Sequence, residues 1–293
     1  MNILILGVTG MIGSNLFRSL SQRKNCTLIG TYRGQILGDQ LWECGKNTLV
    51  RLDDPEGPEL VKIIKDHRVD VVINAIGIIK SQLGFLGIEE KIQAIQANAL
   101  LPLKLQTIAK KQNVRLIQIS TDCVFSGLDG FPYTEKHQPN ATDFYGVTKR
   151  MGEVTGENTL TIRTSLIGEE LFGRQRNLLA WFLNVPKECS GFYKAYFNGL
   201  TVVEFAKILY DYVIFNTKLE GTYHIGANRI SKFSLLKLIS KVYELNIEIH
   251  RIDEPVVDRT LDFSHFQKST GYSPTRWVTM IKEMHNCRLD HSA

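Results

Sequence analysis

The sequence has no long apolar run and no recognisable export signal. None of its hydrophobic stretches approaches the roughly 20 residues that a membrane-spanning helix needs. The opening residues, MNILILGVTG, lack the basic region and the small-residue cleavage site of a secretory signal peptide. We therefore expect no membrane span and no export, and the apolar start is better explained as a buried strand.

Cysteine is scarce and scattered. No C-x-x-C pair or other metal-like spacing occurs among the five cysteines, Cys26, Cys44, Cys123, Cys189 and Cys287. An odd number of cysteines without such spacing is typical of free thiols in a reducing compartment. We expect a cytoplasmic protein without a metal site.

Dense charge is also absent. The net charge is +5, from 35 Lys and Arg against 30 Asp and Glu, and the basic residues form no long block. A nucleic-acid-binding face would be denser, so we expect no nucleic-acid partner. A mild positive charge still favours an anionic ligand by steering.

Short apolar runs alternate with helical stretches through the first half of the chain. Five runs without polar alternation predict buried strands at 3–6, 26–33, 47–53, 70–77 and 114–120, and a sixth covers 159–168. Helices are expected between them, including a long one over 89–112 that is kinked or broken at Pro102. This order is typical of an α/β fold with a doubly wound parallel sheet.

Past residue 168 the alternation loosens. Helices are expected at 178–183, 201–215 and 234–245, and strands at 221–227 and 247–253. We predict a Rossmann domain over 1–168, to which 198–228 return. A smaller C-terminal α/β lobe, which would bind substrate, would consist of 169–197 and 229–293.

A glycine-rich turn joins the first strand to the first helix. GVTGMIG places Gly7, Gly10 and Gly13 at G-x-x-G-x-x-G spacing. Gly7 would end the strand in a tight turn, Gly10 would let backbone approach a pyrophosphate, and Gly13 would let helix and strand pack closely. The helix N-terminus offers free N–H groups to phosphates. The motif and its context predict dinucleotide binding.

The second and third strands bear on which dinucleotide is bound. NAD-binding folds usually end the second strand with a carboxylate, but here it ends GTYRG, so Arg33 is available for a 2′-phosphate. We expect NADPH or NADP, with NADH as the alternative. Asp53 could accept from the adenine amino group or cap the next helix. At the end of the fourth strand, the small residues within 74–77 leave room for a ribose.

The stretch DFYGVTKRMGE carries Tyr145 and Lys149 on one helix face, because residues four apart are neighbours there. An ammonium near a phenol lowers the phenol's pKa, so the tyrosine could give a proton to a ketone while a nicotinamide delivers hydride. Ser120 and Thr121 follow the fifth strand at the carboxyl edge of the sheet, where ligands bind in such folds. Thr121 would supply a second hydroxyl to the same oxygen.

These motifs together resemble the extended short-chain dehydrogenase/reductase superfamily over nearly the whole chain. Within it, the dTDP-4-dehydrorhamnose reductase family is the most similar. The matching stretches are ILGVTGMIGSNL, NAIGIIK, QANALLPLKL, ISTDCVFSGLDGFPYTE, DFYGVTKRMGE, LTIRTSLIG and TGYSPTRW.

The resemblance implies a cytoplasmic, NADPH-dependent reductase of a nucleotide-linked 4-keto-6-deoxy sugar, either monomeric or homodimeric. It implies that Tyr145 protonates the C4 oxygen, that Thr121 hydrogen-bonds this oxygen, and that Lys149 binds the nicotinamide ribose and tunes the tyrosine. Asn98 would support this network, or it would only bond to a loop. Glu153, in the MGE that follows, is expected to pack the helix.

Two sets of binding residues complete the expectation. Cofactor contacts are expected from Gly7, Thr9, Gly10, Met11, Ile12, Gly13, Arg33, Asp53, Asn74, Ala75, Ile76, Gly77, Asn98, Ser120, Tyr145 and Lys149. Substrate contacts are expected from Asp122, Cys123, Leu166, Arg174, Asn198 and Arg259. Arg163 would face the cleft or pair with a core carboxylate, and His224 is expected to be a satisfied core histidine.

Two residues depart from the family pattern. Cys123 and Leu166 stand where the rhamnose-type reductases usually carry tyrosine and tryptophan. Smaller side chains favour a branch that resembles reductases of UDP-linked 4-keto-6-deoxy-N-acetyl sugars. The alternatives are a sugar-nucleotide 4,6-dehydratase, an epimerase, and a non-catalytic NADP-binding protein similar to the regulatory subunit of methionine adenosyltransferase.

Overall fold

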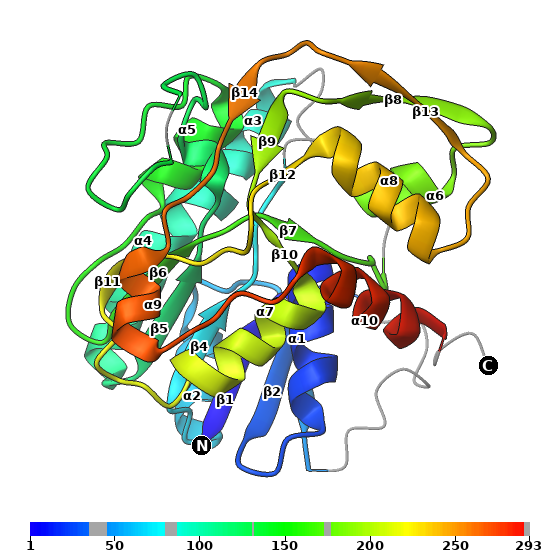
Figure 1. Ribbon diagram of the computed structural model, residues 1–293. Coiled ribbons are helices and arrows are strands. Elements are labelled where there is room, and N and C mark those ends of the chain that lie inside the picture. Colours follow the sequence, from blue (N-terminus) through cyan, green and yellow to red (C-terminus); the bar gives the residue numbers. More distant parts are fainter. Residues whose placement is uncertain (35–45, 80–86, 131, 173–176, 290–293) are drawn as a thin grey trace.

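The computed structural model describes residues 1–34, 46–79, 87–130, 132–172 and 177–289. Within these residues, seven parallel strands form one sheet with helices on both faces (Figure 1). In spatial order the strands are β11 (Gly221–His224), β6 (Thr159–Arg163), β5 (Arg115–Ile119), β4 (Val71–Asn74), β1 (Asn2–Leu6), β2 (Thr27–Tyr32) and β3 (Thr48–Arg51). The order confirms the predicted doubly wound α/β fold.

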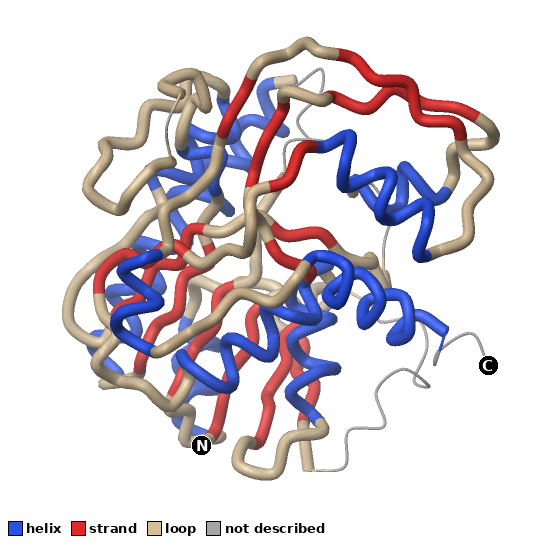
Figure 2. The backbone as a smooth tube through the Cα atoms, viewed as in Figure 1, coloured by secondary structure: helices blue, strands red, loops and turns tan. Residues whose placement is uncertain are grey.

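Both faces of the sheet are buried, which explains the unbroken apolar runs. Along β1, Ile3 and Ile5 face one hydrophobic core, while Leu4 and Leu6 face the other, because successive side chains of a strand alternate. The first core includes α1 (Met11–Ser21) and α7 (Val202–Ile208), and the second includes α2 (Pro58–Asp66) and α4 (Leu101–Gln112). Figure 2 shows the strands between these helical layers.

The long helix predicted over 89–112 is interrupted by a π turn. It consists of α3 (Ile88–Ile95), the π segment Gln96–Leu100 and α4. Pro102 lies in the first turn of α4, where its missing N–H is tolerated. The interruption therefore comes just before Pro102, and the chain continues as a helix through it.

The sixth predicted strand, 159–168, is shorter than expected. After β6 the chain leaves the sheet, and β7 (Leu166–Ile167) pairs instead with β10 (Leu200–Thr201). At the end of β6, the Arg163 carbonyl oxygen accepts a hydrogen bond at 3.1 Å from Ile225 N, which lies just past β11. Beyond this point the chain leaves the large sheet and enters the smaller lobe.

The smaller lobe is built from short strands and two helices, α6 (Leu178–Leu183) and α8 (Lys232–Val242). Its strands are β8 (Glu188–Phe192), β9 (Ala195–Phe197), β12 (Ile230–Ser231), β13 (Glu248–Ile252) and β14 (Val257–Asp258). In Figure 1, α6, α8, β8 and β13 form a group at the upper right.

The chain returns to the large sheet through α7 and β11, in line with the predicted return of 198–228. Two later helices also reach the large domain: α9 (Ser264–Thr270) packs against β11, and α10 (Trp277–Leu289) against α7. The exact domain boundaries stay a prediction. No helix in the described ranges has the length and apolarity to cross a membrane.

The helix α5 (Phe144–Met151) lies unusually close to two neighbouring segments. A Cβ on Gly146 would lie 2.3 Å from the Cys123 carbonyl oxygen, and one on Gly152, just past the helix, would lie 1.9 Å from the Asn98 carbonyl oxygen. Both neighbours are backbone atoms, which cannot turn aside. These two glycines therefore set the distance of α5 from the end of β5 and from the π turn.

We predict that Gly152→Ala lowers the free energy of unfolding by about 1–3 kcal/mol, because the added methyl group overpacks a backbone contact. Gly87→Ala is the control, since its nearest neighbour is the end of the flexible Glu90 side chain. Denaturant unfolding of both variants measures the difference. Equal stability of the two would contradict the close packing.

Candidate active site

The glycine turn has the geometry of a phosphate-binding loop. Gly7 has φ +82°, a left-handed conformation that favours glycine. A Cβ on Gly13 would lie 2.3 Å from the Gly7 carbonyl oxygen, so helix and strand could not pack this closely with any other residue. Gly10 is the N-cap of α1 and provides no side-chain cap, which leaves N–H groups of the first turn for an anion.

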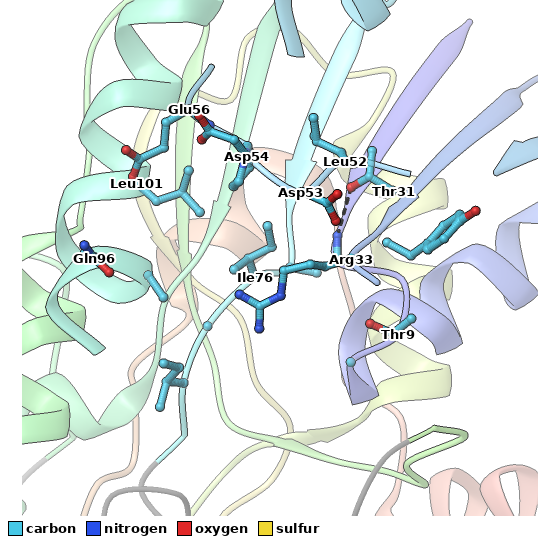
Figure 3. Close-up of a pocket in the computed structure, with 18 of the residues that line it drawn as sticks. Thr9, Thr31, Arg33, Leu52, Asp53, Asp54, Glu56, Ile76, Gln96 and Leu101 are labelled. Carbon is cyan, nitrogen blue, oxygen red and sulfur yellow. Dashed lines mark hydrogen bonds between the residues drawn. The ribbon is translucent and has the colours of Figure 1, made fainter. Parts of the chain in front are cut away.

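A cavity of about 750 Å³ opens beside this turn. Its walls come from the carboxyl ends of β1, β2 and β4, the segment after β3, and the π turn (Figure 3). Thr31 closes part of the floor, where its hydroxyl accepts from Gly7 N at 3.3 Å. The size suits a small-molecule or cofactor site.

Arg33 and Asp53 both line this cavity but differ in their partners. The guanidinium of Arg33 extends into the middle of the cavity (Figure 3) and forms no ion pair within the described chain. Asp53 pairs with Arg51 at 2.7 Å and accepts from Gly34 N, and these contacts lower the pKa of its carboxyl. The capping alternative for Asp53 is wrong, because α2 has Gly57 as its N-cap without a side-chain bond.

A second cavity of about 250 Å³ continues from the first, with which it shares residues of the glycine turn and of the segment after β4. It ends at Ser120, Tyr145 and Lys149. The expected cofactor residues that line it are Thr9, Gly10, Met11, Ile12, Asn74, Ala75, Ile76, Gly77, Ser120, Tyr145 and Lys149. A path therefore runs from Arg33 past the glycine turn to the tyrosine.

Lys149 is buried at the inner end of this path. Its ammonium donates to the Ile119 carbonyl at 2.8 Å. Burial lowers the pKa of Lys149 to about 8, and the negative charge of Glu153 opposes that fall. Glu153 in turn accepts from Ser120 Oγ at 2.7 Å and pairs with Arg163 at 2.7 Å. Glu153 thus does more than pack the helix.

Thr121 and Tyr145 meet beside the lysine. The Thr121 hydroxyl lies close enough to the Tyr145 phenol to lower its pKa, and Thr121 Oγ1 donates to Asp122 Oδ1 at 3.1 Å. Tyr145 is partly buried, and desolvation raises the pKa of its phenol above the ordinary value. The expected lowering of this pKa by Lys149 is therefore not found in this structure.

Cys123 is an unreactive thiol here. Burial and then the charge of Asp122 raise its pKa to about 12. A thiol held in its neutral form is a poor nucleophile, so Cys123 serves as part of the wall around Thr121. The other described cysteines, Cys26, Cys189 and Cys287, are free as well.

Two asparagines have structural contacts. Asn98 accepts from Ile78 N and donates to Ile78 O, both at 2.9 Å, and lies 3.3 Å from Thr148 Oγ1 on α5. It lines neither cavity and braces the loop after β4 against α5. Both polar atoms of the Asn198 amide bond the main chain of Leu261, and the expected contact of Asn198 with substrate stays a prediction.

The other residues that the sequence singled out lie in several different parts of the structure. Leu166 packs against the main core at β7, and Arg163 pairs with Glu153 inside the protein. His224 is a satisfied core histidine, as expected, with Nδ1 3.0 Å from the Tyr133 carbonyl oxygen. Arg259 donates from Nε to the Phe125 carbonyl at 2.9 Å. Arg174 lies outside the described residues.

Lys232, which the sequence did not single out, belongs to the same region. Its ammonium lies 3.7 Å from the centre of the Phe197 ring. Its charge and that of Arg259 act on both Asp122 and Cys123. No sequence signal could mark this lysine, because α8 and the end of β5 meet only in the folded chain.

The fold is that of the extended short-chain dehydrogenase/reductases. Residues 1–287 match the family described as the RmlD substrate binding domain, and the chain belongs to that family. The family assignment confirms the resemblance seen in the sequence.

Individual relatives agree with this assignment. A dTDP-4-dehydrorhamnose reductase from Streptomyces griseus is 29% identical over 154 residues, which cover 51% of this chain and 43% of the relative. The matched region thus spans about half the length of such curated relatives.

Two solved structures cover nearly the whole fold. A hypothetical dTDP-4-dehydrorhamnose reductase from Sulfolobus tokodaii is 27% identical, with a TM-score of 0.74 over 94% of this chain and 98% of that one. A dTDP-4-dehydrorhamnose reductase from Bacillus anthracis, in complex with NADP, is 18% identical, with a TM-score of 0.75 over 97% and 98%.

We predict that Lys149 titrates near pH 8 in the free protein and that Glu153→Gln lowers this pKa further, because the variant removes the charge that favours the ammonium. NMR titration of lysine side chains measures both values, with Lys149→Arg identifying the signal. Glu157→Gln, at an exposed position, is the control and should leave the pKa unchanged. An unshifted pKa in Glu153→Gln would contradict the coupling.

Proposed function

We propose that the protein reduces the C4 ketone of a nucleotide-linked 4-keto-6-deoxy sugar with NADPH. The observation that carries the proposal is the continuous path from Arg33 to Tyr145. It starts at a cation, passes a glycine turn with free N–H groups and ends where Tyr145, Thr121 and Lys149 meet. Membership of the family and the names of the relatives support the substrate class.

The residues present fit the cofactor. A side chain on Gly13 would collide with the Gly7 carbonyl, so the tight turn requires glycine there, and the uncapped start of α1 suits a pyrophosphate. Arg33 would hold the 2′-phosphate, in keeping with the NADP found in the Bacillus anthracis structure. When bound, NADPH supplies the hydride.

The chain's own residues would supply the proton and the binding of the ketone. Tyr145 gives its phenolic proton to the oxygen that becomes the C4 hydroxyl, while Thr121 donates a hydrogen bond to the same oxygen. The raised pKa of Tyr145 keeps the phenol protonated before the reaction. Lys149 binds the nicotinamide ribose, and its positive charge stabilises the phenolate that the transfer leaves.

The sugar nucleotide would bind between Thr121 and the smaller lobe. Asp122, Cys123 and Arg259 lie on that side, and Arg259 can contact a phosphate or a sugar hydroxyl. Because Cys123 is small, the wall there leaves room for a 2-acetamido group, which favours a UDP-linked N-acetyl sugar. Comparing turnover of UDP-4-keto-6-deoxy-GlcNAc with its dTDP-glucose counterpart tests this choice, and faster turnover of the latter would reject it.

Specific residues argue against the rival functions. A 4,6-dehydratase needs a further acid and base for water elimination and usually carries Glu after the Thr-Asp pair, where this chain has Cys123. An epimerase retains NAD and usually carries a carboxylate at the end of the second strand, where this chain has Arg33. A cytoplasmic enzyme, monomeric or homodimeric, fits the proposal.

We expect NADPH oxidation, followed by its absorbance, when a 4-keto-6-deoxy sugar nucleotide is added. Tyr145→Phe should lower kcat by about two to four orders of magnitude, because the variant cannot donate the proton. NADPH binding, measured by fluorescence titration, should survive this substitution. If no such substrate is turned over while NADPH still binds, the regulatory-subunit alternative is favoured.

We expect Arg33→Ala to raise the KM for NADPH about ten- to a hundredfold, because a charge-assisted hydrogen bond to the 2′-phosphate is lost. The KM for NADH should hardly change. Arg251→Ala, in the smaller lobe and paired with Asp253, serves as the control. Equal effects on both cofactors would contradict the role given to Arg33.

A further inference from the structure

The hydroxyl of Thr121 has more partners than its single proton can serve. Cys123 N donates to Thr121 Oγ1 at 3.2 Å. The Thr121 hydroxyl is placed to donate to the Asp122 carboxyl oxygen at 3.1 Å, and it lies close enough to the Tyr145 phenol to lower the pKa of that phenol. A threonine hydroxyl has one proton to donate and two lone pairs to accept with. The direction of each bond therefore depends on its neighbours.

The charge of Asp122 decides where that proton points. An ionised carboxylate only accepts hydrogen bonds, so it would take the Thr121 proton for itself. Thr121 could then no longer donate toward Tyr145 or toward a ketone oxygen. A protonated carboxyl can instead donate to Thr121 Oγ1, and this leaves the threonine proton free to point at the ketone.

We propose that Asp122 works as a neutral acid, a positioning residue that turns the Thr121 hydroxyl toward the substrate oxygen. The proposal deepens the proposed reduction and rests on it for its kinetic consequences. No bond is formed or broken at Asp122, and its proton stays on the carboxyl through the reaction.

The surroundings of Asp122 favour the neutral form. Its side chain is only 5% exposed, and within the described chain it forms no ion pair. A buried carboxylate without a close cation or several N–H donors is costly, so the group takes up a proton instead. In keeping with this, burial raises the pKa of Asp122 above its ordinary value.

Two cations act in the opposite sense. Lys232 on α8 and Arg259 after β14 both lower the pKa of Asp122, with Lys232 the stronger of the two. Hydrogen bonds from the Thr121 hydroxyl and the Cys123 thiol also lower this pKa, and the Tyr145 phenol is the other group that faces the carboxyl. Since the last two keep their protons, Lys232 and Arg259 are the charges that set the pH at which Asp122 ionises.

The first test measures protonation without substrate. In protein labelled with ¹³C at the aspartate carboxyl, the signal assigned by Asp122→Asn should titrate above the ordinary aspartate pKa of about 3.9. Ionisation of Asp122 at or below that ordinary value would overturn the proposal. This result does not depend on the substrate, so it stands apart from any failure of the proposed reduction.

The second test uses the pH profile of kcat at saturating NADPH. Ionisation of Asp122 should give a fall in kcat with rising pH, separate from any fall near pH 8 due to Lys149. Asp122→Asn should lack the first fall. Its kcat should be about tenfold or more higher than that of Asp122→Ala, because the amide can still donate to Thr121. An unchanged profile in Asp122→Asn, or equal activity of the two variants, would overturn the proposal.

Lys232→Met provides a shift with a defined sign. Removing this cation favours the neutral carboxyl, so the fall in kcat should move to higher pH by about one unit. Lys237→Met, which removes a cation of the same helix that lies over the Phe233 ring, is the matched control and should not move it. A shift to lower pH in Lys232→Met would overturn the role of Asp122.

Discussion

The buried ion pair between Glu153 and Arg163 is the interaction on which the candidate site depends. One carboxylate binds the end of β6 through Arg163 and the end of β5 through Ser120, and it lies at the end of α5. Breaking one partner of such a pair leaves a buried charge, which is strongly destabilising. The pair therefore fixes α5 against the edge of the sheet, and the charge of the Glu153 carboxylate favours the Lys149 ammonium.

Positively charged side chains lie at both ends of the path that leads to this ion pair. Arg33 stands at one end, while Lys232 and Arg259 stand beyond Thr121 at the other. Between them the raised pKa values of Tyr145 and Cys123 hold both groups in their protonated forms. Anionic groups would be bound at the two ends of the path, and proton transfer would take place in a region of low dielectric between them.

Local rules predicted much of this arrangement from the sequence. Gly7, Gly10 and Gly13 were recognised by spacing, and Tyr145 and Lys149 by the geometry of one helix face. Long-range contacts were beyond such rules. The early end of β6, the amide of Asn198 bound to Leu261, and the position of Lys232 near Asp122 each join segments far apart in the chain. The pKa of Tyr145 also depends on burial, which a motif does not report.

The π turn before α4 has a consequence for how this chain can change in length. A π turn holds one residue more than the α-helical path around it. Deleting one residue within 96–100 would close the π turn into a regular α-helical turn and keep α3 in register with α4, yet it would remove the wide turn that holds Asn98 in place. The loop held by Asn98 would then lose its brace without any loss of helix. Related chains that keep this brace should accordingly tolerate substitutions in the segment far better than gaps.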